Sequence, residues 1–116
     1  MTGSVEQRRQ DILDAIARVW VADRRMRLGE SLGDDVGVQV AVQAILHNLV
    51  VISEAVEAIP AEILGQAPQT PWTDIAAMRD VVGGPYQRVD PATLRRAVDD
   101  DLGPLELAVR RLRTVP

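Results

Sequence analysis

The most constraining feature of this chain is the segment of residues 36–59, which is apolar around most of its girth. Its polar residues recur at gaps of four, four, seven and three, which places them on one narrow stripe of a helix: Gln39, Gln43, His47, Glu54 and Glu57. That spacing does not fit the two-residue period of a strand, although valine is common here. A helix with so little polar surface must be covered on several sides. We therefore predict either the central helix of a bundle or part of a subunit interface. Asn48 points away from the stripe, so it should be buried and hydrogen-bonded.

Other segments also carry apolar residues at helical spacing. A helix is predicted over residues 5–27, and Gly29 and Gly33 break the pattern after it. A short helical turn is predicted at 60–66 and a further helix over 71–82. A last helix starts at Asp90-Pro91, and its apolar phase survives Gly103-Pro104, so we expect one long kinked helix. The chain is thus predicted to be all-α, an antiparallel up-and-down bundle of four main helices. A length of 116 residues favours a single domain over residues 1–116.

Composition excludes several classes of site. The chain has no cysteine and one histidine, which excludes disulfide scaffolds and thiol nucleophiles and makes an all-protein transition-metal cage improbable. Asp99-Asp100-Asp101 is interpreted as a solvated face rather than a metal site, and no cofactor is implied. No apolar run reaches 18 residues and the first ten residues are polar, so we expect a cytoplasmic protein without a membrane span or secretory signal. The net charge of −4 argues against a whole-surface nucleic-acid binder.

Arg79 is the most informative charged residue. On a helical wheel it lies inside the core-facing arc of the 71–82 helix, which comprises Trp72, Ile75, Ala76, Met78 and Val82. An inward-pointing arginine must be paired, for instance with Glu54, must extend its stem so that the charged end reaches water, or must face a wet cleft that can hold an anion. Tyr86 is the only tyrosine and follows a glycine-proline turn, either as a group held near the helix end or as an exposed loop residue without a role.

At these residues the chain resembles the HepT-like toxins of the HEPN superfamily, the ribonuclease partners of minimal nucleotidyltransferase antitoxins. Their motif is an arginine, then Asn or Asp, then a histidine five residues after the arginine, then one residue and a tyrosine. Arg79, Asp80 and Tyr86 match it, whereas Gly84 stands at the histidine position. The resemblance covers nearly the whole chain. It includes residues 11–16, 48–55 (with Ser53 where the family usually has glycine), Pro71-Trp72, 88–90 and Asp101-Leu102.

The resemblance implies a homodimer that brings two arginine motifs together across a shared groove, and metal-independent RNA cleavage. The chain would be the toxin subunit of a type VII-like toxin–antitoxin pair. Arg79 would hold the scissile phosphate, with Asp80 and the residue at position 84 beside it, and the antitoxin would attach AMP to Tyr86. Weaker candidates for an RNA or partner groove are Glu54, Asn48 and Arg88.

Gly84 is the main departure from the family pattern. Glycine can neither accept nor donate a proton, and losing a general base typically lowers the rate by about 10²- to 10⁴-fold. His47 carries the only imidazole of the chain, and it is expected to be a surface or interface residue. The chain is therefore a naturally weakened homologue, a deliberately inactivated variant, or a protein in which position 84 does not correspond to the histidine.

Two other interpretations remain open. The first is a non-catalytic helical interaction module that binds a nucleotidyltransferase partner or a nucleotide. The second is a helical dimer in which Arg79 forms a structural ion pair, so that Arg79→Ala would cost several kcal/mol.

Overall fold

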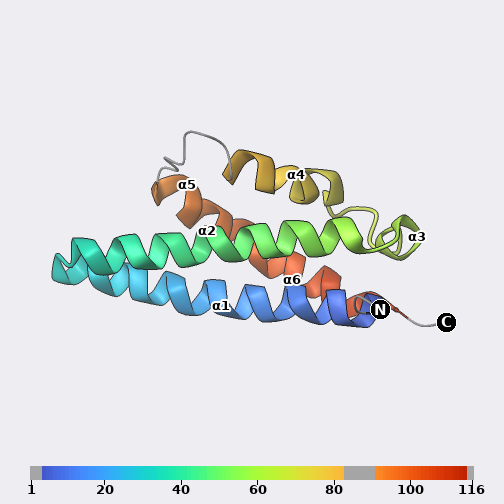
Figure 1. The fold of residues 1–116 in the computed structure, drawn as a ribbon, viewed down its shortest axis with the longest axis horizontal. Coiled ribbons are helices and arrows are strands. Elements are labelled where there is room, and N and C mark those ends of the chain that lie inside the picture. The colour runs from blue at the N-terminus through green and yellow to red at the C-terminus, as the bar shows by residue number, and fades with distance from the viewer. Residues whose placement is uncertain (1–3, 83–90, 115–116) are drawn as a thin grey trace.

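The computed structural model describes residues 4–82 and 91–114, and within them every regular element is a helix. The elements, in chain order, are α1 (Val5–Leu32), α2 (Asp35–Ala58), α3 (Ala61–Leu64), α4 (Trp72–Val82), α5 (Pro91–Arg96), the π-helical turn η1 (Ala97–Asp101) and α6 (Leu102–Arg111). Figure 1 shows a long α1–α2 hairpin, with α4 on one side of α2 and the continuous α5–η1–α6 helix running across the hairpin. The predicted all-α bundle is confirmed.

The α1–α2 hairpin is longer than predicted, because α1 ends at Leu32 rather than near residue 27. Gly29 does not break the helix. It is buried within α1, and a Cβ built on it would come within 3.0 Å of the Val38 side chain, so glycine here lets α2 approach closely. The helix ends at Gly33, whose φ of 70° lies in the left-handed region that favours glycine. Asp34 then caps α2 by accepting a hydrogen bond from the Gly37 backbone N–H at 3.0 Å.

The core lies where α1, α2 and the last helix meet. Its fully buried large side chains are Ile12, Ile16, Val19, Met26, Ile45, Ile52, Val56, Val98 and Val109. The polar stripe of α2 is exposed, as predicted. Asn48 is buried, also as predicted, and its Nδ2 donates to the Ala44 carbonyl at 2.8 Å. Its Oδ1 has no hydrogen-bond partner among the described residues. Helix α2 packs against α1 on one side and α4 on the other (Figure 1).

The last helix is continuous, as predicted, but its irregular turn lies just before Gly103-Pro104 rather than at it. Pro104 has no N–H to donate to the carbonyl one turn earlier, and the backbone accommodates this with the π-helical turn η1. The aspartates of η1 are exposed, as expected for a solvated face.

Ion pairs fasten this helix to α1. Arg27 donates to Asp23 at 3.0 Å and to Asp99 at 2.8 Å, and Arg95 pairs with Glu30. The hydrogen bonds to Asp23 and Asp99 raise the pKa of Arg27 above its usual value. A cation with a raised pKa loses its stabilising charge only when the pH rises through that pKa, so these contacts keep their cation until strongly alkaline pH.

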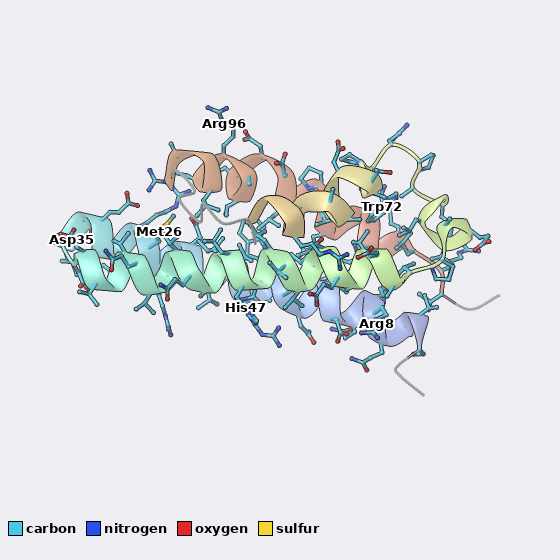
Figure 2. All side chains as sticks on the ribbon, turned by 45° about the horizontal axis from the view of Figure 1, so that its top comes forward. Arg8, Met26, Asp35, His47, Trp72 and Arg96 are labelled. Carbon is cyan, nitrogen blue, oxygen red and sulfur yellow. The ribbon has the colours of Figure 1, made fainter. Side chains whose placement is uncertain are left out.

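Both ends of the described chain lie at one end of the bundle (Figure 1). Arg9 donates from Nε to the Val109 carbonyl and from Nη2 to the Arg110 carbonyl, both at 3.0 Å. The Thr114 hydroxyl donates to Glu6 at 2.7 Å. The α1–α2 turn lies at the opposite end, where Figure 2 labels Asp35.

Of the described helices, α2 is long and apolar enough to cross a membrane by length and composition, a test that core helices of folded proteins also pass. Only 33% of its most apolar window is buried within this chain.

Candidate functional site

Helix α4 is anchored on α2 and on the segment that precedes it. The indole Nε1 of Trp72 donates to the carbonyls of Leu64 at 2.9 Å and Ala67 at 3.0 Å, which fixes the start of the helix. The residues predicted to face the core are partly buried against it: Trp72, Ile75, Ala76 and Met78. The side chain of Val82 lies outside the described residues. This packing orients the last turn of α4, which carries Arg79.

Arg79 forms a bidentate ion pair with Glu57 of α2. The distance from Nη1 to Oε2 is 2.7 Å and that from Nη2 to Oε1 is 3.2 Å. The two side chains are 41% and 50% exposed, so the pair lies at the surface rather than in the core. The prediction of an inward-pointing guanidinium was wrong in this respect, and the partner is Glu57 rather than Glu54. The charged end of Arg79 instead reaches Glu57 on the exposed polar stripe of α2, which corresponds to the alternative of an extended stem.

Ser53 holds the backbone of α4 at the level of Arg79. Its hydroxyl is fully buried, donates to the Ala76 carbonyl at 2.6 Å and accepts from the Arg79 backbone N–H at 3.4 Å. The sequence marked Ser53 only as a departure from the glycine that the family usually has at this position. It marked Glu57 only as one residue of the polar stripe, and neither residue was predicted to contact Arg79. The signal for Glu57 was present, because it lies three residues after Glu54 on the same helical face.

The structure gives no single cluster for the other predicted site residues. Asp80 lies in α4 but its side chain, like the whole of Gly84, Tyr86 and Arg88, is outside the described residues. Asn48 lines a groove between α1 and α2, which Arg79 does not line. Glu54 is exposed on α2. His47 is exposed as well, as predicted for a surface residue, and Figure 2 shows it on α2.

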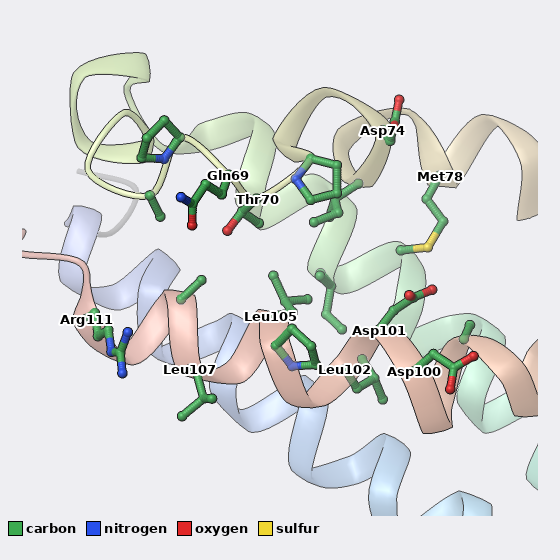
Figure 3. A pocket seen from close by; sticks show the side chains of 18 of the residues that line it. Gln69, Thr70, Asp74, Met78, Asp100, Asp101, Leu102, Leu105, Leu107 and Arg111 are labelled. Atoms are coloured by element: carbon green, nitrogen blue, oxygen red, sulfur yellow. The ribbon is translucent and has the colours of Figure 1, made fainter.

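A cleft of about 1010 Å³ separates α4 from η1 and α6, with Leu49 and Ile52 of α2 among its lining residues (Figure 3). The charged side chains that line it are Asp74, Asp100, Asp101 and Arg111. Three carboxylates against one guanidinium repel a polyanion, so this cleft is a poor site for RNA. Arg79 is not among its lining residues.

Comparison with known proteins gives one family. The family model described as "Ribonuclease HepT-like" matches residues 21–112, a range that includes α4 and Arg79. A protein named "Probable ribonuclease HepT", from Thermococcus cleftensis, is 33% identical over 70 residues. That alignment covers 60% of this chain and 64% of the Thermococcus protein, slightly less than two thirds of its length. No solved structure matches the chain. Because the family model covers most of the helical bundle, the chain belongs to the HepT-like ribonuclease family.

Proposed function

We propose that this chain is the toxin subunit of a type VII-like toxin–antitoxin pair and an endoribonuclease whose catalysis is weakened by Gly84. Family membership supports the reaction class, and the relative named a probable ribonuclease supports RNA as the substrate. The observation that carries the proposal is the position of Arg79. It is half-exposed, oriented by Glu57 and Ser53, and stands at the end of the helix that leads into the motif segment.

Arg79 has the chemistry to bind a phosphate of RNA. A guanidinium binds phosphate and carboxylate through the same planar, bidentate geometry, so an RNA phosphate at this site would compete with Glu57 or share the guanidinium with it. The pair keeps the guanidinium oriented before RNA arrives, which lowers the entropic cost of placing it against a developing charge. Arg79 is thus the proposed phosphate-binding residue, and Glu57 a positioning residue.

The remaining parts of the proposal rest on the family motif. Cleavage would be metal-independent, with Asp80 beside Arg79 and no proton-transfer group at Gly84. Two copies would bring their arginine motifs together in a homodimer. A minimal nucleotidyltransferase antitoxin would attach AMP to Tyr86 and so add bulk and negative charge that repel RNA. Glu54 and Arg88 are weaker candidates for contacts with RNA or the partner.

The alternative is a non-catalytic interaction module that binds a nucleotidyltransferase or a nucleotide through the same face. The exposed pair of Arg79 and Glu57 fits such a contact as well, because both side chains are accessible.

Restoring the histidine tests the proposal. We expect the purified chain to cleave single-stranded or transfer RNA slowly in the presence of EDTA, and Gly84→His to raise the rate by about 10²- to 10⁴-fold. Adding Arg79→Ala to Gly84→His should abolish this gain, whereas adding Arg8→Ala, at a partly exposed arginine of α1, should leave it unchanged. A folded Gly84→His variant with no gain in cleavage would favour the interaction module. Fast cleavage by the unaltered chain that persists after His47→Ala would contradict the weakened site.

A further inference from the structure

The turn end of the α1–α2 hairpin carries an exposed apolar surface that this chain does not cover. Five large apolar residues there are between 41% and 71% exposed: Val21, Leu28, Leu32, Val36 and Val40. We call these five residues the hairpin surface. Elsewhere among the described residues, Leu107 is the one large apolar side chain of comparable exposure. A concentrated apolar surface of this kind marks an interaction site more often than scattered single residues do.

A groove of about 730 Å³ runs between α1 and α2 beside this surface. Val21, Leu28, Leu32 and Val40 line it, together with small residues such as Ala22, Gly29, Gly37, Ala41 and Ala44. Asn48 also lines the groove, and its buried Oδ1 has no hydrogen-bond partner among the described residues. Along α1 the groove runs from Ala17 to Leu32, about 22 Å at the usual helical rise.

Charges at the hairpin end are arranged for self-association. Arg24 and Arg25 of α1, and Asp35 at the start of α2, are exposed and take part in no ion pair within the described part of the chain. At about 1.5 Å of rise per residue, Arg24 lies about 6 Å before Leu28, and the turn that holds Asp35 begins about the same distance after it. A two-fold rotation about Leu28 therefore brings the acidic turn of each copy beside the arginines of the other. A two-fold contact requires such self-complementarity.

We propose that the hairpin surface is where two copies of this chain bind each other, antiparallel and centred on Leu28. Asp35 of each copy would then pair with Arg25 of the other, and Val21, Leu32, Val36 and Val40 would become buried. The contact is distinct from the Arg79–Glu57 pair, because Glu57 lies 21 residues beyond Val36 on α2, about 30 Å away. The proposal therefore does not depend on the proposed function.

The first test measures mass in solution by size-exclusion chromatography with light scattering. At about 100 µM, where a contact with a Kd of about 1 µM is saturated, the unaltered chain should be an even-numbered oligomer. Leu28→Glu places two carboxylates against each other at the centre of the contact, so it should halve that mass. Leu107→Glu is the matched control and should keep the original mass. Circular dichroism should show unchanged helix content in both variants, because both leucines are exposed.

A charge exchange tests the orientation. Arg25→Asp and Asp35→Arg should each weaken association about tenfold or more, since each puts like charges opposite one another. The double variant should recover most of the lost affinity, because every copy again carries complementary charges. Three results would overturn the proposal: a monomeric unaltered chain, a Leu28→Glu variant that keeps the original mass, or a double variant no stronger than the single ones. A Leu28→Glu variant that keeps the original mass would still be compatible with a dimer formed through the arginine motif. The test therefore distinguishes the hairpin contact from that dimer.

Discussion

At the scale of single residues, two contacts with different burial hold Arg79 within the described part of the chain. Ser53 fixes its backbone through a buried hydroxyl, whereas Glu57 holds its guanidinium at the surface. Buried hydrogen bonds contribute more to stability than exposed ion pairs do, because water screens exposed charges and competes for them. Most of the stabilisation at this point of α4 therefore comes from the buried hydroxyl of Ser53 rather than from the exposed ion pair of Arg79 with Glu57.

Arg79→Ala should consequently cost little stability. We expect a loss of at most about 1 kcal/mol in the free energy of unfolding, the range for exposed ion pairs, measured by urea denaturation of the unaltered chain and the variant. Glu57→Gln, which keeps the size of the side chain, should cost a similarly small amount. A loss of several kcal/mol would instead show that Arg79 is mainly structural, as the ion-pair interpretation of the sequence requires.

At the scale of elements, the sequence predicted what depends on periodicity. The polar stripe of α2, the burial of Asn48 and the continuity of the last helix follow from spacing, and the structure confirms them. The sequence alone could not distinguish Gly29 from Gly33, because both glycines are expected to break a helix. Only the structure shows that Val38 packs against Gly29. Tertiary contacts that periodicity does not encode also explain why the partner of Arg79 was not predicted. A helical wheel gives the direction of Arg79 from its helix but not where a long flexible side chain ends, so Glu57 was missed.

The hairpin turn provides the prediction at this scale. Gly33 has a φ of 70° and nothing within 4 Å of the place where a Cβ would stand, so a substitution there meets a conformational cost rather than a steric clash. Gly33→Ala should lower the free energy of unfolding by about 1 kcal/mol. Gly33→Asn should cost clearly less, because asparagine adopts left-handed backbone more readily. Thermal unfolding of both variants checks this, and equal losses for alanine and asparagine would contradict it.

At the scale of the whole molecule, the bundle is elongated, with principal extents of 50 × 29 × 27 Å, and is fastened at both ends of the α1–α2 hairpin. Near the turn, α1 is tied to α5 and η1 by the pairs of Arg27 and Arg95. At the other end, Arg9 donates to the carbonyls of Val109 and Arg110 in the last turn of α6, and the Val109 carbonyl also accepts from the Leu112 backbone N–H at 3.2 Å. The last helix is thus held to α1 at two well-separated points.

Removing the second of these attachments should loosen the last helix. The Arg9 side chain is only 18% exposed and donates to two carbonyls, so Arg9→Ala should lower the free energy of unfolding by about 1–2 kcal/mol. Amide hydrogen exchange should become faster in the last turn of α6, and the increase there should be larger than in the rest of the chain. Arg8→Ala is the control and should stay within about 0.5 kcal/mol, because Arg8 makes only a long contact of 3.9 Å to Asp11. Similar losses for both variants would show that the two carbonyl contacts do not stabilise the helix end.

The contacts of Arg9 and of Thr114 with Glu6 have a practical consequence. They gather both described termini at one pole of the molecule, while the turn at Gly33 forms the other pole (Figure 1). Anything joined to either terminus, whether an affinity tag, a fluorophore or further polypeptide, therefore departs from the same place. The distal pole stays unobstructed by such attachments, and its contacts can be studied with a label at whichever terminus is convenient.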